Sequence, residues 1–165
     1  MDMLLIGAIS GGYDGGKVGE RCVSLEEEKT QMAIWAISAS PLIMGNDMRK
    51  VAQESMEVLL NEHAIAVSQD SLGQMGIRLS QNSSTQIWAR KMANGDVAVA
   101  LYNRGDSTHP GAAADITCQF AMPGIDLLGP VNVFDIWAKK SVGTFTAEYT
   151  ATSVPFHGTI CGKKK

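Results

Sequence analysis

The chain has 165 residues, of which 45% are hydrophobic and 19% are charged, and its formal net charge at pH 7 is −3. This length allows one medium domain or two small ones, and the hydrophobic share is ordinary for a globular protein. The slight negative charge argues against a general attraction to nucleic acid or to acidic membranes, and no apolar stretch approaches the roughly 20 residues that span a bilayer.

The chain begins with the pattern of a strand followed by a helix. Residues 2–6 are an apolar run without alternation, which indicates a short parallel strand buried on both faces. After a Gly-rich segment, Ser24 and Glu27 form a capping box at the start of a helix. We expect this helix to continue to about Ser40, because Pro41 cannot extend it.

A second strand and a second helix follow in the same order. The strand is expected at residues 41–45, and the helix over about Ala52 to His63, with a stripe of Met56, Leu59, Leu60 and His63. Strands that alternate with helices of this length indicate a parallel sheet. Two such units leave both sheet edges unpaired, so we expect residues 1–72 to belong to a larger α/β fold.

The pattern changes near Gly73 to short alternating strands with Gly and Pro turns between them. The clearest signal is a hairpin over residues 85–103, with Asn94-Gly95 at its turn. Further strands are expected at 114–121, 131–138, 143–150 and 153–161. We therefore divide the chain into an α/β part, residues 1–72, and an antiparallel β-sandwich, residues 73–165.

Five long segments, in order along the chain, resemble the C-terminal part of glycoside hydrolase family 27, which holds α-galactosidases (melibiases) and α-N-acetylgalactosaminidases. Three are similar to the last quarter of its barrel: DMLLIG, EEKTQMAIWAISASPLIMGNDMRK and NEHAIAVSQDSLGQMGIRL. Two are similar to its C-terminal domain: IWARKMANGDVAVALYNRG and FDIWAKKSVGTFTAEYTATSVPFHG. The resemblance implies an α/β plus all-β chain, with the last two βα units of a (β/α)8 barrel followed by a C-terminal antiparallel β-sandwich.

The same resemblance implies hydrolysis of terminal α-linked galactose with retention of configuration, which needs two carboxylates about 5–5.5 Å apart. In the family these come from a Lys-x-Asp stretch and from an Asp-rich stretch before the seventh strand. This sequence contains neither stretch. We therefore expect no catalytic residue in this chain and no hydrolase activity from it alone.

For an intact parent protein we expect an α-galactoside oligosaccharide or glycoconjugate as substrate, a secreted or lysosomal location, no cofactor, and no nucleic-acid or membrane partner. The sequence leaves open a homo-oligomer and the choice between galactose and N-acetylgalactosamine. Two other interpretations also stay open. One is a non-catalytic carbohydrate-binding or interaction module in residues 73–165, and the other is a truncated gene product.

The resemblance assigns a substrate-binding role to Asp2 and Met3, which match positions that line the galactose pocket of the family. Asn46 and Asp47 follow the second strand, at the face where a barrel carries its chemistry, but we favour a role as helix caps. Asp70 lies in a segment similar to the family's turn into the β-domain, so we do not assign it to a catalytic pair.

The remaining polar and aromatic residues give weaker signals. We interpret the tryptophans as packing residues: Trp35, Trp88 and Trp137. The histidines have no metal-ligand spacing, so no metal site is expected: His63, His109 and His157. The cysteines fit no framework, although one pair could bridge in a secreted protein: Cys22, Cys118 and Cys161. Asn82 begins an N-glycosylation sequon, which matters only in the secretory pathway.

Overall fold

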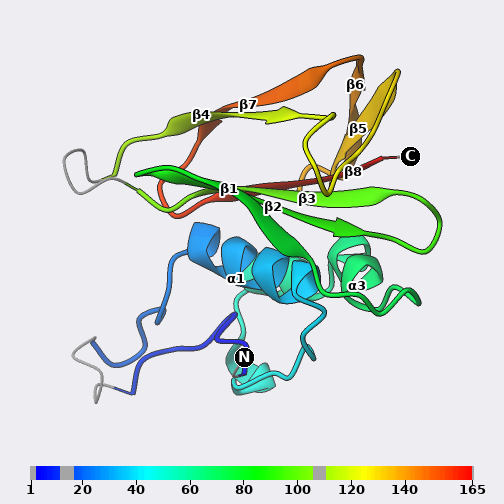
Figure 1. The fold of residues 1–165 in the computed structure, drawn as a ribbon. Coiled ribbons are helices and arrows are strands. Elements are labelled where there is room, and N and C mark those ends of the chain that lie inside the picture. The colour runs from blue at the N-terminus through cyan, green and yellow to red at the C-terminus, as the bar shows by residue number, and fades with distance from the viewer. Residues whose placement is uncertain (1–2, 12–16, 106–110, 165) are drawn as a thin grey trace.

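The computed structural model describes residues 3–11, 17–105 and 111–164. A six-stranded antiparallel sheet lies at its centre, with helices on one face and a two-stranded sheet on the other (Figure 1). The large sheet runs in the order β1 (Ile77–Gln81), β2 (Thr85–Lys91), β3 (Val97–Asn103), β8 (Thr159–Lys164), β5 (Val131–Asp135) and β6 (Lys140–Phe145). The small sheet pairs β4 (Ala114–Gln119) with β7 (Glu148–Val154).

The two strands predicted at 2–6 and 41–45 are reduced to a single parallel bridge in the described residues. Leu4 bridges Met44, its amide donates to the carbonyl of Ile43 (2.7 Å), and its carbonyl accepts from the amide of Gly45 (3.0 Å). The predicted direction is therefore right and the predicted length is wrong. Neighbouring strands that would extend the pairing are absent from the part of the chain that the structure describes.

Helix α1 (Leu25–Ile37) begins where the capping box predicts. The hydroxyl of Ser24 accepts from the amide of Glu27 (3.3 Å), and the Glu27 carboxylate accepts from the amide of Ser24 (2.8 Å). The helix ends at Ile37, earlier than expected, because Ala39 adopts a left-handed conformation with φ of 52°. Local sequence signals thus located the start of this helix better than its end.

The predicted helix from Ala52 to His63 is wrong, because two short helices occupy this region: α2 (Gln53–Leu59) and α3 (Glu62–Ser68). The break is at Asn61, whose Oδ1 accepts from the amides of His63 and Ala64, both at 3.1 Å. Leu60 was placed on the apolar stripe, but its side chain is 66% exposed. A 3₁₀ helix, η1 (Met48–Lys50), precedes the pair.

The predicted hairpin around Asn94-Gly95 is confirmed as β2 and β3, with Gly95 at a φ of 83° in the turn. The strands predicted at 114–121 and 131–138 are confirmed as β4 and β5, which begin at the predicted residues and end two or three residues earlier, whereas the last two predictions are wrong in position. The strand predicted at 143–150 spans the end of β6 and the start of β7, which are separate strands, and the last strand begins at Thr159 rather than at residue 153. Strand β1 was not predicted individually.

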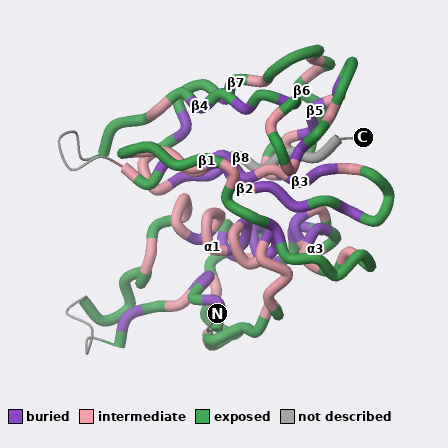
Figure 2. Tube along the Cα trace, viewed as in Figure 1, coloured by how far each residue is buried: buried purple, intermediate pink, exposed green. Residues whose placement is uncertain are grey.

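Strand β3 separates two hydrophobic clusters, because its side chains alternate between the faces of the sheet. Ala98 and Ala100 face the cluster under the helices, which also contains Met32 and Ile37, and Figure 2 shows this buried layer between α1 and the sheet. The opposite face packs into the sandwich with Val97, Leu101, Ile116, Ile125, Ala151 and Val154. The small alanines allow α1 to approach the sheet closely.

The connection between α3 and β1 passes directly beneath the end of α1. The amide of Gly76 donates to the carbonyl of Ile37 (2.8 Å), and a Cβ added at Gly76 would lie 2.6 Å from the carbonyl oxygen of Ala89. Only glycine fits between these two backbones. The helical part and the sandwich are therefore in backbone contact at this point.

Candidate site at the strand ends and the helix–sheet junction

The residues that were predicted to bind substrate lie at the N-terminal bridge. Met3 is 49% exposed, and a Cβ added at Gly45 would lie 3.1 Å from the Met3 Cβ, so these residues are neighbours on the two paired segments. Asp2 lies outside the described residues. The structure thus brings Met3 to an accessible surface next to the second segment.

Asn46 and Asp47, which follow the paired segment 41–45, hold the backbone in place. Asn46 Nδ2 donates to the carbonyl of Ile6 (2.8 Å). Asp47 Oδ1 accepts from the amide of Arg49 (3.1 Å) and caps η1, and the Arg49 Nε also lies 2.9 Å from Oδ1. The hydrogen bonds from the Arg49 side chain and amide lower the pKa of Asp47. Asp47 therefore caps the short helix, which was the role favoured for it.

Glu28 is a polar residue at this site that sequence reasoning missed. Its side chain is fully buried, and Oε1 accepts from the amide of Gly7 (2.9 Å) and from the hydroxyl of Ser55 (3.0 Å). Arg21 Nη1 lies 3.6 Å from Oε2. Glu28, which belongs to α1, thus links this helix to the turn at Gly7 and to Ser55 of α2. In the sequence it stood among three glutamates that suit any helix start, so its burial had no signal.

A second missed residue, Arg90 of β2, lies at the junction between helices and sheet. It is 1% exposed, and Nη1 donates to the carbonyls of Ala36 (2.7 Å), Val67 (2.6 Å) and Ser68 (3.3 Å). Burial lowers the pKa of this guanidinium. These carbonyls are at the ends of α1 and α3, where the helix dipoles favour a positive charge.

A third contact joins the start of α1 to the loop between β7 and β8. His157 Nδ1 lies 2.8 Å from Glu27 Oε1, and the Thr30 hydroxyl donates to the carbonyl of His157 (2.6 Å). The pKa of Glu27 is lowered, first by the hydrogen bond from the Ser24 amide and also by His157. One carboxylate therefore serves the capping box and the contact with the sandwich.

The three tryptophans, predicted to be packing residues, are all half-buried. Trp35 and Trp137 pack against the cluster under the helices, and each also lines a surface groove. The Trp88 Nε1 donates to Gln86 Oε1 (2.9 Å), and the Arg78 guanidinium lies 5.7 Å from its ring centre. The rings of Trp35 and Trp137 therefore pack against the core on one side and border a surface groove on the other.

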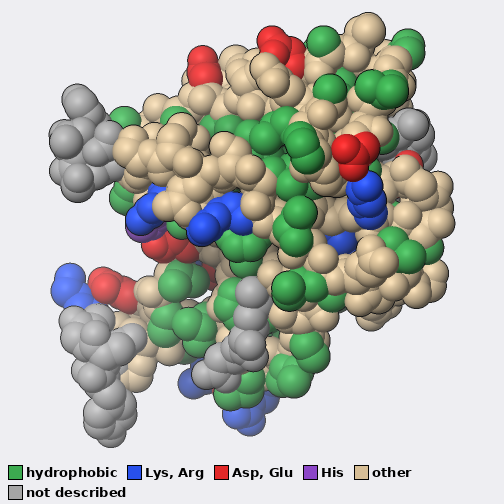
Figure 3. Space-filling view, viewed as in Figure 1, with side chains coloured by type: hydrophobic (Ala, Val, Ile, Leu, Met, Phe, Trp, Pro, Cys, Tyr) green, Lys and Arg blue, Asp and Glu red, His purple; other side chains and the backbone are tan. Residues whose placement is uncertain are grey.

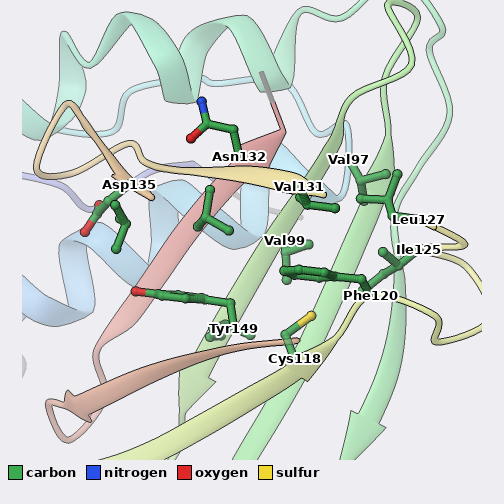
Figure 4. A pocket seen from close by; sticks show the side chains of 13 residues that line it. Val97, Val99, Cys118, Phe120, Ile125, Leu127, Val131, Asn132, Asp135 and Tyr149 are labelled. Atoms are coloured by element: carbon green, nitrogen blue, oxygen red, sulfur yellow. The ribbon is translucent and has the colours of Figure 1, made fainter. Parts of the chain in front are cut away.

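The interior of the sandwich contains a small apolar cavity of about 40 Å³. Figure 4 shows the rings of Phe120 and Tyr149 and the sulfur of Cys118 beside it, with Val97 and Val99 on strand β3. Burial raises the pKa of the Cys118 thiol to about 11, so this thiol is a packing group and a poor nucleophile. The cavity is far smaller than an engineered apolar cavity of roughly 150 Å³ that binds benzene.

Within residues 3–11, 17–105 and 111–164, no three His, Cys, Asp or Glu side chains are grouped so that they could hold a metal ion. His109, one of the three predicted non-ligands, lies outside the described residues. No helix in this part of the chain has the length and apolarity needed to cross a membrane.

Two family models match consecutive segments of the chain. The model described as alpha galactosidase A matches residues 6–70, and the model described as alpha galactosidase C-terminal beta sandwich domain matches residues 82–163. The chain belongs to glycoside hydrolase family 27. This membership confirms the resemblance seen in the sequence and the predicted fold class, with family 27 barrel units followed by an antiparallel sandwich.

Individual family 27 proteins are similar over most of the chain. It is 32% identical to alpha-galactosidase 2 of Arabidopsis thaliana over 84% of its length, and 32% identical to alpha-galactosidase of Coffea arabica over 82%. It superposes on the crystal structure of alpha-galactosidase I from Mortierella vinacea with a TM-score of 0.79 and 31% identity, over 99% of this chain and 38% of that one. The chain spans about a third of the length of these curated relatives.

Proposed function

We propose that this chain supplies the last two βα units and the C-terminal β-sandwich of a retaining α-galactosidase-type hydrolase, which removes terminal α-linked galactose from oligosaccharides or glycoconjugates. The observation that carries the proposal is the consecutive match of the two family models to residues 6–70 and 82–163. The proposed division at residue 73 falls between these matches. The catalytic carboxylate pair comes from the remainder of the hydrolase.

In this proposal Asp2 and Met3 line the galactose pocket. The exposure of Met3 beside Gly45, at the paired strand segments, supports an accessible position for it. Preceding βα units would pack against the same edge. Two features support that arrangement: the Leu5 amide is bonded to Gln31 Oε1 (2.8 Å) instead of a strand, and apolar side chains are exposed nearby at Met3, Leu5, Ile43, Met44 and Met48. Figure 3 shows hydrophobic side chains at the surface of this lower part of the molecule.

A chimera tests this function. The matched C-terminal third of the Coffea arabica relative is replaced by this chain, and hydrolysis of a chromogenic α-galactoside is measured. We expect the chimera to be active, the Asp2→Asn change to lower its kcat/KM by about tenfold or more, and the isolated chain to give no turnover above a buffer blank. A folded but inactive chimera, or turnover by the isolated chain, would refute the proposal.

We also propose that the parent hydrolase passes through the secretory pathway, as a secreted or lysosomal protein, and carries a glycan on Asn82. The β1–β2 turn supports this, because Asn82 is exposed there and its Oδ1 accepts from the amides of Ser84 (2.9 Å) and Thr85 (2.6 Å), which hold the turn in place. Expression through a eukaryotic secretory route is expected to add a glycan mass that Ser84→Ala removes and Ser83→Ala retains. An unmodified wild-type chain would contradict the assignment.

A further inference from the structure

A large groove lies where α1 and α2 meet the turn that follows β5, and its volume is about 520 Å³. Lys29 lines it from α1 and Glu57 from α2. Asp135 lines it from the end of β5, and Trp137 and Lys139 from the turn. Both halves of the chain therefore contribute walls. All of these lining residues lie in the part of the chain that the structure describes, so the groove needs no other segment to exist.

The floor of the groove is apolar. Trp137 lines it together with Leu25, Val58 and Pro155. The indole nitrogen of Trp137 is buried, so the part of the ring that borders the groove is carbon. Asp135 Oδ1 fixes the ring's backbone, because it accepts from the amides of Trp137 (2.9 Å) and Ala138 (3.1 Å). The aromatic surface is thus held in place before any ligand arrives, which lowers the entropic cost of binding.

The rim of the groove carries hydrogen-bonding groups of both signs. Glu26 and Lys29 form an ion pair (2.7 Å), and Glu54 pairs with Arg21 (3.2 Å), so much of the charge is compensated internally. Glu57 and Lys139 are exposed and add one acceptor and one donor group. The lining has four carboxylates (Glu26, Glu54, Glu57 and Asp135) and two lysines (Lys29 and Lys139). An anionic ligand would therefore meet net negative charge, whereas a neutral ligand with many hydroxyls would find both donors and acceptors.

We propose that this groove is a binding site for a neutral pyranoside, with Trp137 in contact with the C–H face of the sugar ring and the rim side chains bonded to its hydroxyls. An aromatic surface beside mixed polar groups suits an amphipathic ring of this kind. The site differs from the substrate pocket proposed above, because it uses neither Asp2 nor Met3. Binding here requires no hydrolysis, so its failure would leave the proposed function intact.

The test is an NMR titration of the 165-residue chain with methyl α-D-galactopyranoside, and with glucuronate as an anionic sugar. We expect saturable shifts of the Trp137 indole and of amides 135–139, with weaker binding of glucuronate. Lys139→Ala and Trp137→Phe should each raise the Kd by about threefold to tenfold, up to about 1.4 kcal/mol. The matched control Lys140→Ala, next in sequence but outside the groove, should leave the Kd unchanged.

Loss of binding must be distinguished from loss of the fold. Trp137→Phe retains an aromatic ring against the cluster under the helices, and its thermal transition is measured to establish that it is folded. If it is unfolded, Lys139→Ala and Glu57→Gln provide the comparison, because both change only exposed side chains. Absence of saturable shifts in the wild type, or shifts that Lys139→Ala and Glu57→Gln leave unaltered, would overturn the proposal.

Discussion

At the scale of single residues, Arg90 is the side chain on which the helix–sheet junction depends most. Neither α1 nor α3 has a basic residue in its last turn. Arg90, in strand β2, provides the positive charge at the C-terminal ends of both helices. A buried carbonyl that loses its donor costs free energy, and this guanidinium serves three. The junction is thus held by one cation that comes from the sheet.

Replacement of this residue should be costly. We expect Arg90→Met to lower the free energy of unfolding by about 2–4 kcal/mol, because the carbonyls of Ala36, Val67 and Ser68 lose a charged donor while the apolar packing is largely kept. Arg104→Met, at an exposed arginine, should change it by less than about 0.5 kcal/mol. Urea unfolding followed by circular dichroism measures both. Equal stability of the two variants would contradict this role of Arg90.

Glu27 gives a pH dependence with a defined sign. Its pKa in the folded protein is lowered, so the ionised form stabilises the fold above the unfolded pKa, and this contribution is lost as the pH falls through the folded pKa. Because the side chain is 35% exposed, the effect is small, below about 1 kcal/mol. We expect Glu27→Gln to be less stable than wild type at neutral pH and the difference to shrink in acid. A difference that grows in acid would refute this.

At the scale of elements, the start of α2 is the least well capped helix end. Ala52 is its N-cap residue, has an extended conformation (φ −67°, ψ 153°) and makes no side-chain bond to the helix amides. The capping box of α1 and the cap at Asn61 satisfy equivalent groups elsewhere. Nothing in the backbone of Ala52 prevents a better cap.

We therefore expect Ala52→Ser to stabilise the protein by about 0.5–2 kcal/mol, because a hydroxyl at this position can accept from the free amides of the first turn. Ala66→Ser, at an exposed position within α3, is the matched control and should be neutral or slightly destabilising. Thermal melts of the two variants beside wild type decide the matter. No gain for Ala52→Ser relative to Ala66→Ser would count against the cap.

At the scale of the whole molecule, the helical part and the sandwich should resist opening together, except at the paired segments near the N-terminus. Helix α1 packs directly on the sheet, whereas residues 41–50 are held by one bridge, the bond from Asn46 to the carbonyl of Ile6 and a short 3₁₀ helix. Amide exchange should therefore be slow in α1, β2 and β3 and fast in residues 41–50. Mass spectrometry after deuteration measures it. Equally fast exchange in α1 and residues 41–50 would show that the helix does not share the stability of the sheet.

The parts of the fold that the sequence predicted are those with local causes. The capping box from Ser24 to Glu27 and the hairpin at Asn94-Gly95 each depend on residues a few positions apart. The cap at Asn61 has a local cause, because its Oδ1 accepts from the amides of His63 and Ala64, but its burial could not be foreseen, because its Nδ2 donates to the carbonyl of Ile136, 75 positions away. The burial of Arg90 has the same origin, since its acceptors are in helices that precede it by many residues. The resemblance assigned Asp2 and Met3, whereas the polar groups that hold the site's backbone became visible only in three dimensions.

The close passage of Gly76 between Ile37 and Ala89 has a consequence for recombining relatives of this protein. A crossover placed at residue 73 would join helices from one parent to a sandwich from another, and would pass through a place where two backbones leave no room for adjustment. Shuffled libraries should instead inherit α1, this connection and the first hairpin as one block. Crossovers are better tolerated after this block, at the exposed turn of Asn94 and Gly95 that follows β2.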